Sequence, residues 1–249
     1  YYSTHTKNME KLGGLLKRMP YTGLLFLIGC LSISSMPFFN GFISEWFTLQ
    51  ALFQSIGISG NAIKLIAILA AAVLAMAGAF AAACFVKAFG ISFLGVPRST
   101  EAQNSIEVPF NMLLGTGLLT FMCILFGLFP QIVLVLLDKV SNSIVKASIV
   151  PQLKGFSSFV YYPKGLESNK ISPMLILTAG IIIAVMVFLV VKFISRSTKE
   201  RKYSTWDCGF KELNPRMQYT ATGFSKPLRI VFRAIYRPSR ELQPEGGTS

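Results

Sequence analysis

The sequence has few side chains that hold metal ions or redox cofactors. Its 249 residues include one histidine, His5, and four cysteines, none of them in a C-x-x-C pair. A structural zinc or an iron–sulfur cluster needs several such ligands, so we expect neither in this chain by itself. Phosphate-binding loops of the GxxxxGK[ST] type and dinucleotide fingerprints are also absent. We therefore expect no catalytic centre and no cofactor within the chain.

Charged residues are also scarce, at 14% of the chain against 52% hydrophobic residues. Soluble domains carry about 25% charged residues. The deficit falls in long apolar stretches, and a membrane-spanning helix needs about 20 such residues. The sequence predicts an all-α, polytopic transmembrane helix bundle with about four spans.

The apolar and polar stretches divide the chain into successive regions. We predict a membrane-surface segment at 1–20, a helix-bundle portion at 21–137, a connection at 138–172, a C-terminal transmembrane helix at 173–195 and a basic tail at 196–249. Within the bundle portion we expect a discontinuous helix at 21–57 and spans at 62–95 and 110–137. In the span 62–95, alanines recur every four residues at Ala71, Ala75, Ala79 and Ala83, a pattern that favours close approach of another helix.

The helix at 21–57 is predicted to be broken. Pro37 removes a backbone donor, and Asn40 and Gly41 add a second break. Backbone that is not helical is tolerated at membrane depth only where protein buries it or water lines it, so such a break is typical of transport proteins. The alternative is a span that ends at Pro37, followed by a separate surface helix.

The net charge of +13 is concentrated near the end of the chain. Twelve Lys and Arg but only three acids lie between Lys192 and Arg240, directly after the last apolar stretch. This is typical of a cytoplasmic flank beside anionic lipid, and we expect no nucleic-acid partner. With four spans and a basic start, both ends are predicted to be cytoplasmic in the plasma membrane. The five lysines of 138–172 run against this assignment.

Two ionisable residues lie in apolar surroundings, Glu45 just past the break and Lys87 in the second long span. A charge in hydrocarbon costs at least about 2.5–3.5 kcal/mol, so such residues usually face a bundle interior or a water-filled path, and they often mark ion or proton routes. Two plainer interpretations stay open. Lys87 could extend to the membrane surface, and Glu45 could cap the second half of the broken helix.

The stretch from Lys11 to Glu45 resembles the antiporter-like membrane subunits of respiratory complex I, Mrp-type cation antiporters and membrane-bound [NiFe] hydrogenases. The residues that carry the resemblance are Lys11-Leu-Gly-Gly-Leu, Met19-Pro20, Phe26-Leu-Ile-Gly29 and Met36-Pro-Phe-Phe-Asn-Gly-Phe-Ile-Ser-Glu45. Many relatives have Pro-Pro where this chain has Met36-Pro37. The resemblance implies that Glu45 terminates a proton pathway.

Later motifs are similar to the hydrogenase-4 and formate hydrogenlyase branch. They are Ala81-Ala-Ala-Cys-Phe-Val-Lys-Ala-Phe-Gly90, Thr205-Trp-Asp-Cys-Gly-Phe210, Met217-Gln-Tyr-Thr-Ala-Thr222 and Phe224-Ser-Lys-Pro227. The resemblance covers nearly the whole chain but only the C-terminal part of the family. The family's first discontinuous helix and its central helix have no counterpart here, so we expect another chain, or a longer subunit, to supply them.

The resemblance implies an ion-translocating subunit of a membrane-bound hydrogenase-type redox complex, which couples electron transfer to movement of H⁺ or Na⁺, with H⁺ as the expected ion. The [NiFe] centre and the iron–sulfur clusters would lie in partner subunits of a peripheral arm, and membrane subunits and lipid would surround the chain. The tail would dock against a neighbouring subunit or lipid headgroups. Other interpretations are a structural anchor fragment, a subunit of complex I or an Mrp antiporter, and a stand-alone antiporter.

Overall fold

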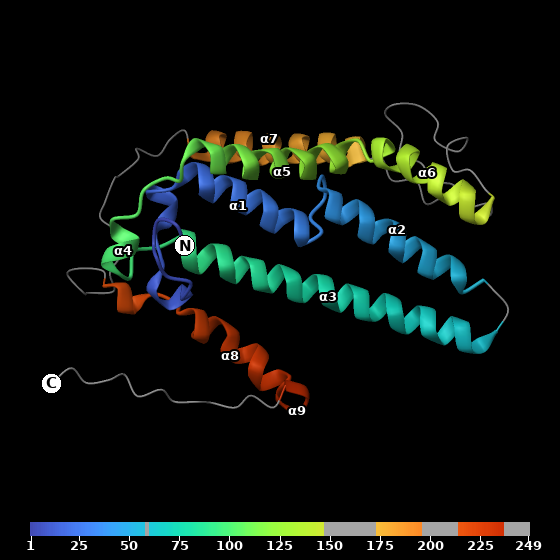
Figure 1. Ribbon diagram of the computed structural model, residues 1–249, viewed down its shortest axis with the longest axis horizontal. Coiled ribbons are helices and arrows are strands. Elements are labelled where there is room, and N and C mark those ends of the chain that lie inside the picture. Colours follow the sequence, from blue (N-terminus) through green and yellow to red (C-terminus); the bar gives the residue numbers. More distant parts are fainter. Residues whose placement is uncertain (58–59, 147–172, 196–213, 237–249) are drawn as a thin grey trace.

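The computed structural model describes residues 1–57, 60–146, 173–195 and 214–236 (Figure 1). All regular elements in these ranges are helices, without a strand among them, as the composition predicts. Three helices contain a segment long and apolar enough to cross a membrane: α3 (Asn61–Phe93), α5 (Phe110–Leu128) and, over Thr178–Ser195, α7 (Pro173–Ser195). Together with the shorter apolar helix α1 (Pro20–Ile33), they confirm the all-α transmembrane bundle.

The segment predicted as a discontinuous helix forms two helices joined by a short link, which fits both the discontinuous helix and the alternative of a span followed by a separate helix (Figure 1). α1 begins with Pro20, whose missing N–H suits a first helical turn, and ends at Ile33. α2 (Asn40–Ser55) follows after six residues. Phe38, in that link, has a φ of +84°, which is unusual for a bulky residue and interrupts the helix. The Ser32 hydroxyl donates to the Asn40 side-chain oxygen and joins the two halves across the break.

α3 lies beside both halves of the broken helix. Its 33 residues correspond to about 50 Å, which exceeds the hydrocarbon thickness of about 30 Å. One end of α3 therefore extends beyond the hydrocarbon. Ala67 and Ala71 are buried on this helix, whereas Ala75 and Ala79 are exposed. Of the four alanines of the predicted stripe, Ala71 is buried and Ala83 is half-buried within this chain, and the stripe as a contact face for another helix stays a prediction.

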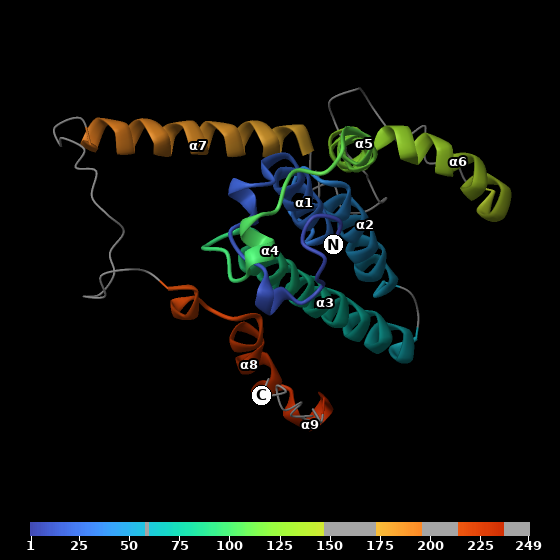
Figure 2. The ribbon, with the colours of Figure 1, turned by 60° about the vertical axis from the view of Figure 1, so that its left-hand side comes forward.

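The structure divides the predicted span at 110–137 into two helices. α5 ends at Leu128, and α6 (Gln131–Val145) starts after Pro130. Proline disfavours the helical conformation in the residue before it, and Phe129 has non-helical angles of φ −124° and ψ 58°. The chain changes direction there, as the different slopes of α5 and α6 show (Figure 2). α6 also extends helical structure into the range 138–145, where a polar connection was predicted.

The N-terminal segment packs against the far end of α3. It contains two short 3-10 helices, η1 (Met9–Lys11) and η2 (Leu15–Lys17). Leu15 forms a small core with Phe93 and with Ala102 of α4 (Thr100–Gln103). The Gly14 N–H donates to the Leu94 carbonyl at 2.9 Å. This segment is therefore part of the folded unit rather than only a surface strip on the membrane.

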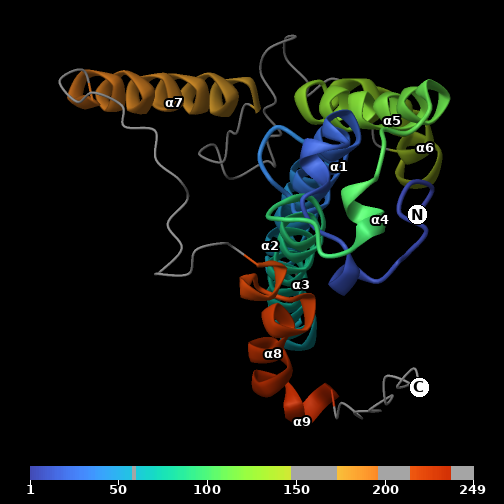
Figure 3. The same ribbon diagram turned by 90° about the vertical axis from the view of Figure 1, so that its left-hand side faces the viewer.

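The described part of the tail also folds back onto α3. It comprises η4 (Pro215–Met217), α8 (Ala221–Val231) and α9 (Arg233–Tyr236). The rings of Phe80 and Phe232 meet edge to face at 5.1 Å between centroids. Figure 3 shows α8 next to α3 and apart from α7. The described tail residues dock on their own chain, and docking of the tail against a neighbouring subunit or lipid headgroups stays a prediction.

Candidate ion-pathway site

Glu45 lies in the second turn of α2 and is half-buried. Both oxygens of its carboxylate lie 3.5 Å from the point where a Cβ atom on Gly78 of α3 would be. Because Gly78 has no side chain, α3 leaves room for the carboxylate between the two helices. Glu45 therefore occupies a contact between helices rather than the lipid-facing side of α2.

The interpretation of Glu45 as a helix cap is not supported. The first turn of α2 contains no acidic residue, and the N-cap residue, Phe39, makes no side-chain capping bond. Among the described residues, Glu45 has no hydrogen bond and no ion pair. Burying a carboxylate without a partner costs free energy, so a half-buried carboxylate of this kind is a candidate functional residue.

The three residues predicted to break the helix lie together at the start of α2. Pro37 lies in the link, Asn40 bonds to Ser32, and Gly41 packs against the end of α1. A Cβ atom on Gly41 would overlap the Ser32 carbonyl oxygen. Glu45 follows Gly41 by four residues, or about 6 Å of helix rise. The break and the carboxylate therefore form one local unit.

α5 closes the other side of the break. A Cβ atom on Gly127 would overlap the Phe38 carbonyl oxygen and would lie 2.6 Å from the Phe39 carbonyl carbon. The backbone of α5 therefore touches the backbone of the link, and only glycine fits there. α7 also reaches the link, since a Cβ atom on Gly180 would lie 3.3 Å from the ring of Phe38.

Sequence reasoning missed one polar residue near Glu45. Gln50, on the same helix, is 8% exposed, and its Oε1 atom is buried without a hydrogen-bond partner among the described residues. Buried amide oxygens nearly always accept a hydrogen bond, from water where protein donors are lacking. A glutamine between two apolar residues, Leu49 and Ala51, was the available signal.

Lys87 lies elsewhere along α3. It follows Gly78 by nine residues, so about 14 Å of helix separates it from the level of Glu45. The structure therefore does not bring the two predicted site residues together. The Lys87 ammonium donates to the Ser225 hydroxyl of α8 at 2.6 Å. Lys87 is half-buried and is bound by the tail, so it does not simply extend into water.

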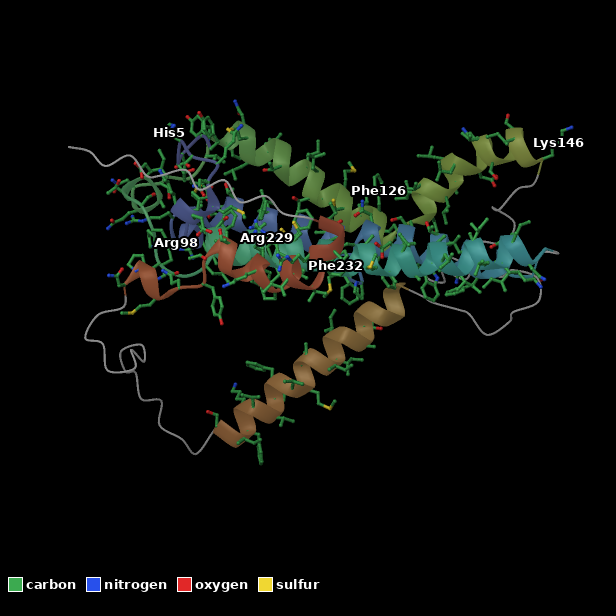
Figure 4. All side chains as sticks on the ribbon, turned by 90° about the horizontal axis from the view of Figure 1, so that it is seen from below. His5, Arg98, Phe126, Lys146, Arg229 and Phe232 are labelled. Atoms are coloured by element: carbon green, nitrogen blue, oxygen red, sulfur yellow. The ribbon has the colours of Figure 1, made fainter. Side chains whose placement is uncertain are left out.

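Four further hydrogen bonds join the start of the tail helix to the rest of the chain. The Glu10 carboxylate accepts from the N–H and the hydroxyl of Thr222, both at 2.7 Å. The Gln218 amide accepts from the Val96 N–H at 3.0 Å and donates to the Val96 carbonyl at 3.2 Å. Figure 4 shows the tail helix, with Arg229 and Phe232 labelled, lying along α3.

The surroundings of the Glu10 carboxylate favour its charged form. Partial burial by itself would raise its pKa, but hydrogen bonds from Thr222 and Ala221 and the positive charge of Arg98 more than offset it, so the Glu10 pKa lies below its ordinary value. Arg98 also donates to the Tyr219 carbonyl at 2.8 Å. The carboxylate is therefore held in its charged form at the first turn of α8, where the helix dipole also favours a negative charge.

Metal ligands do not converge in the part of the chain that the structure describes. Among these residues, no three His, Cys, Asp or Glu side chains form a group that could hold a metal ion. Cys30, Cys84 and Cys123 are free thiols, and Cys208 lies outside the described residues.

Comparisons with known proteins agree with the motifs. Residues 1–75 match the family described as NADH:quinone oxidoreductase/Mrp antiporter, TM. Hydrogenase-4 component B of Escherichia coli is 36% identical over 242 residues, which are 96% of this chain and 35% of that protein. By these matches the chain is similar to antiporter-like membrane subunits. Formate hydrogenlyase subunit 3 of the same organism is 26% identical over 244 residues, 98% of this chain and 37% of that protein.

A solved structure shares the fold of these antiporter-like helices. A chain in the membrane-bound sulfane sulfur reductase, an archaeal respiratory membrane complex, matches 96% of this chain with a TM-score of 0.65 and 19% identity. The match covers 36% of that chain. The present chain thus spans about a third of the length of each of these three proteins, and the activity of a whole subunit does not transfer to it directly.

Proposed function

We propose that this chain is an ion-translocating part of a membrane-bound redox complex of the hydrogenase-4 or formate hydrogenlyase type, and that Glu45 is its protonatable site. The carboxylate of Glu45 carries the proposal: it is half-buried between α2 and α3, lies over Gly78 and has no hydrogen-bond partner among the described residues. A carboxylate in that setting exchanges a proton with any water that reaches it.

The break beside Glu45 supplies the route for water or ions. Its backbone is not helical, so it exposes polar groups at a depth where an unbroken helix shows none. Ser32 and Asn40 line the break on one side, and Gln50 lies beyond Glu45 on the other. In this proposal protons pass between these groups and Glu45. Lys87 is a second charged residue of the proposed pathway, farther along α3.

The rest of the pathway requires other polypeptide. The three relatives described above are two to three times longer than this chain, and we infer that the remaining antiporter-like helices complete the path. Electron transfer would take place in a peripheral arm that holds the [NiFe] centre and iron–sulfur clusters in other subunits. The chain would lie in the plasma membrane with both ends cytoplasmic, and the translocated ion would be H⁺.

The second candidate is a structural anchor that holds partner subunits in the bilayer. Its support is the large apolar surface that α3, α5 and α7 expose within this chain, for example Leu69 at 56%, Leu119 at 67% and Phe193 at 77%. That surface is compatible with lipid or with neighbouring helices, and it does not need Glu45.

The substitution Glu45→Gln separates the two candidates. We expect it to lower the number of ions moved per electron transferred by about tenfold or more, because the amide keeps the shape but cannot take up a proton. The measurement is dye-monitored translocation in membrane vesicles that contain the assembled complex, with hydrogen evolution recorded in parallel. Glu101→Gln, on the exposed helix α4, is the matched control. Unchanged translocation in Glu45→Gln would favour the anchor.

A further inference from the structure

The tail helix places a hydroxyl group directly on one of the charged residues of the membrane bundle. Lys87 and Ser225 are 138 residues apart in the chain, yet the Lys87 Nζ and Ser225 Oγ atoms are 2.6 Å apart. Neither group is fully exposed. The function proposed above uses Lys87 but leaves the tail motif that contains Ser225 without a role.

The hydroxyl of Ser225 is oriented to accept. Its own proton is donated to the Ala221 carbonyl one turn earlier, at 3.2 Å. The oxygen lone pairs are therefore directed away from the helix, where Lys87 donates to them. A neutral acceptor stabilises an ammonium without cancelling its charge, whereas a carboxylate would form an ion pair. Lys87 is thus fixed in place and keeps its net charge.

α8 is held firmly enough to present this hydroxyl. Ala221, on the same face of α8 as Ser225, is buried. The bonds from Glu10 to Thr222 and from Gln218 to Val96 fix the start of the helix, and the contact between Phe80 and Phe232 fixes its end. Ser225 lies between these two attachments. Its position therefore depends on the docked helix as a whole.

We propose that Ser225 is a positioning residue for Lys87, and that the tail motif from Met217 to Pro227 exists to bring this hydroxyl to the end of α3. The proposal rests on the proposed function, in which Lys87 is a station of the ion pathway. It gives the tail a role in the ion pathway of its own chain. In the docked state the ammonium is held at one point instead of sampling the several rotamers that a free lysine adopts.

The test uses the assembled complex in membrane vesicles and measures ions moved per electron transferred. We expect Ser225→Ala to lower this ratio by about three- to tenfold, because a hydrogen bond to a charged group is lost. Ser225→Thr keeps the hydroxyl and is expected to retain the wild-type ratio within about twofold on the same argument. Lys226→Ala, which removes the adjacent exposed charge on α8, is the matched control. Hydrogen exchange of α8 amides reports whether the tail stays docked.

A double-mutant cycle then shows whether Ser225 acts through Lys87. In the Lys87→Gln background, Ser225→Ala should cause no further loss. A wild-type ratio in Ser225→Ala, an equal loss in both backgrounds, or failure of Ser225→Thr to restore transport would each overturn the proposal. If Lys87→Gln itself transports normally, the assignment of Lys87 fails and takes this inference with it, whereas Glu45→Gln still tests the pathway. If only Ser225→Ala is normal, the pathway stands and the inference fails.

Discussion

The two predicted site residues of the bundle, Glu45 and Lys87, have opposite surroundings. Glu45 lies against a glycine and has no partner among the described residues, whereas Lys87 is bound by a hydroxyl from the tail. The proposed function needs a carboxylate that is available to a proton or water at the first site, whereas at the second site the chain's own tail holds the ammonium. The difference indicates two arrangements for a partly buried charged side chain: one is left without a partner, and the other is fixed by a hydrogen bond. The same helix, α3, supports both.

The largest expected effect comes from filling the space at Gly78. Gly78→Leu would put a branched side chain where the Glu45 carboxylate lies, and we expect ion translocation to fall by about tenfold or more, as for loss of the carboxylate itself. The bond between Lys87 and Ser225 should persist, since Lys87 lies about 14 Å farther along α3. Ala79→Leu, at an exposed neighbouring position, is the control for translocation in vesicles. If both variants transport equally, the contact with Gly78 is irrelevant and the comparison breaks down.

A smaller effect is expected at the contact of α5 with the break. Gly127→Ala would push a methyl group into the link backbone, and overpacking of this kind costs about 1–3 kcal/mol. Gly115→Ala on the same helix meets nothing within 4 Å and should be neutral or slightly stabilising, since alanine favours helix by about 1 kcal/mol. Thermal unfolding in detergent measures both. Equal melting temperatures would show that the link backbone moves to accept the methyl group. The link would then not be a rigid support for Glu45.

The smallest effect concerns the attachment of the tail. Because the pKa of Glu10 is lowered in the folded chain, its charged form strengthens docking above its ordinary value of 4.5. That contribution is lost as the pH falls through the lowered pKa. We expect α8 to loosen by a few-fold in population below pH 4.5, consistent with about 0.2–1 kcal/mol for an exposed pair.

Pulsed spin-label distances between Arg229→Cys on α8 and Ala79→Cys on α3 measure this loosening. In Glu10→Gln, which accepts the same bonds without a titrating charge, the distances should not change with pH in that range. A pH dependence that remains in Glu10→Gln would show that another group titrates. Glu10 would then not control how the tail is attached near Lys87.

Much of the fold follows from local signals in the sequence. Proline at 37 and the pair Asn40-Gly41 predict the broken helix, because their effects act on the backbone within a few residues. Pro130 carries the same signal, and its effect on the preceding residue was underestimated when 110–137 was predicted as one span.

The site was harder to predict because it depends on neighbours distant in sequence. Glu45 was recognisable as a charge in an apolar segment, but its glycine partner belongs to another helix. The alanine repeat on α3 predicts a stripe by its spacing of four, but such spacing does not say which helix lies against the stripe. The bond from Lys87 to Ser225 joins residues 138 apart, and no periodicity predicts such a contact.

The uninterrupted length of α3 has a mechanical consequence. A single α-helix of 33 residues behaves as a stiff rod over its length, so an axial shift at one end reaches the other nearly undiminished. The tail is hydrogen-bonded to α3 at Lys87, and the broken helix packs against α3 at Gly78. A pull on the tail by any neighbouring subunit would therefore move the surface under the Glu45 carboxylate by a similar distance, without any change in the broken helix itself.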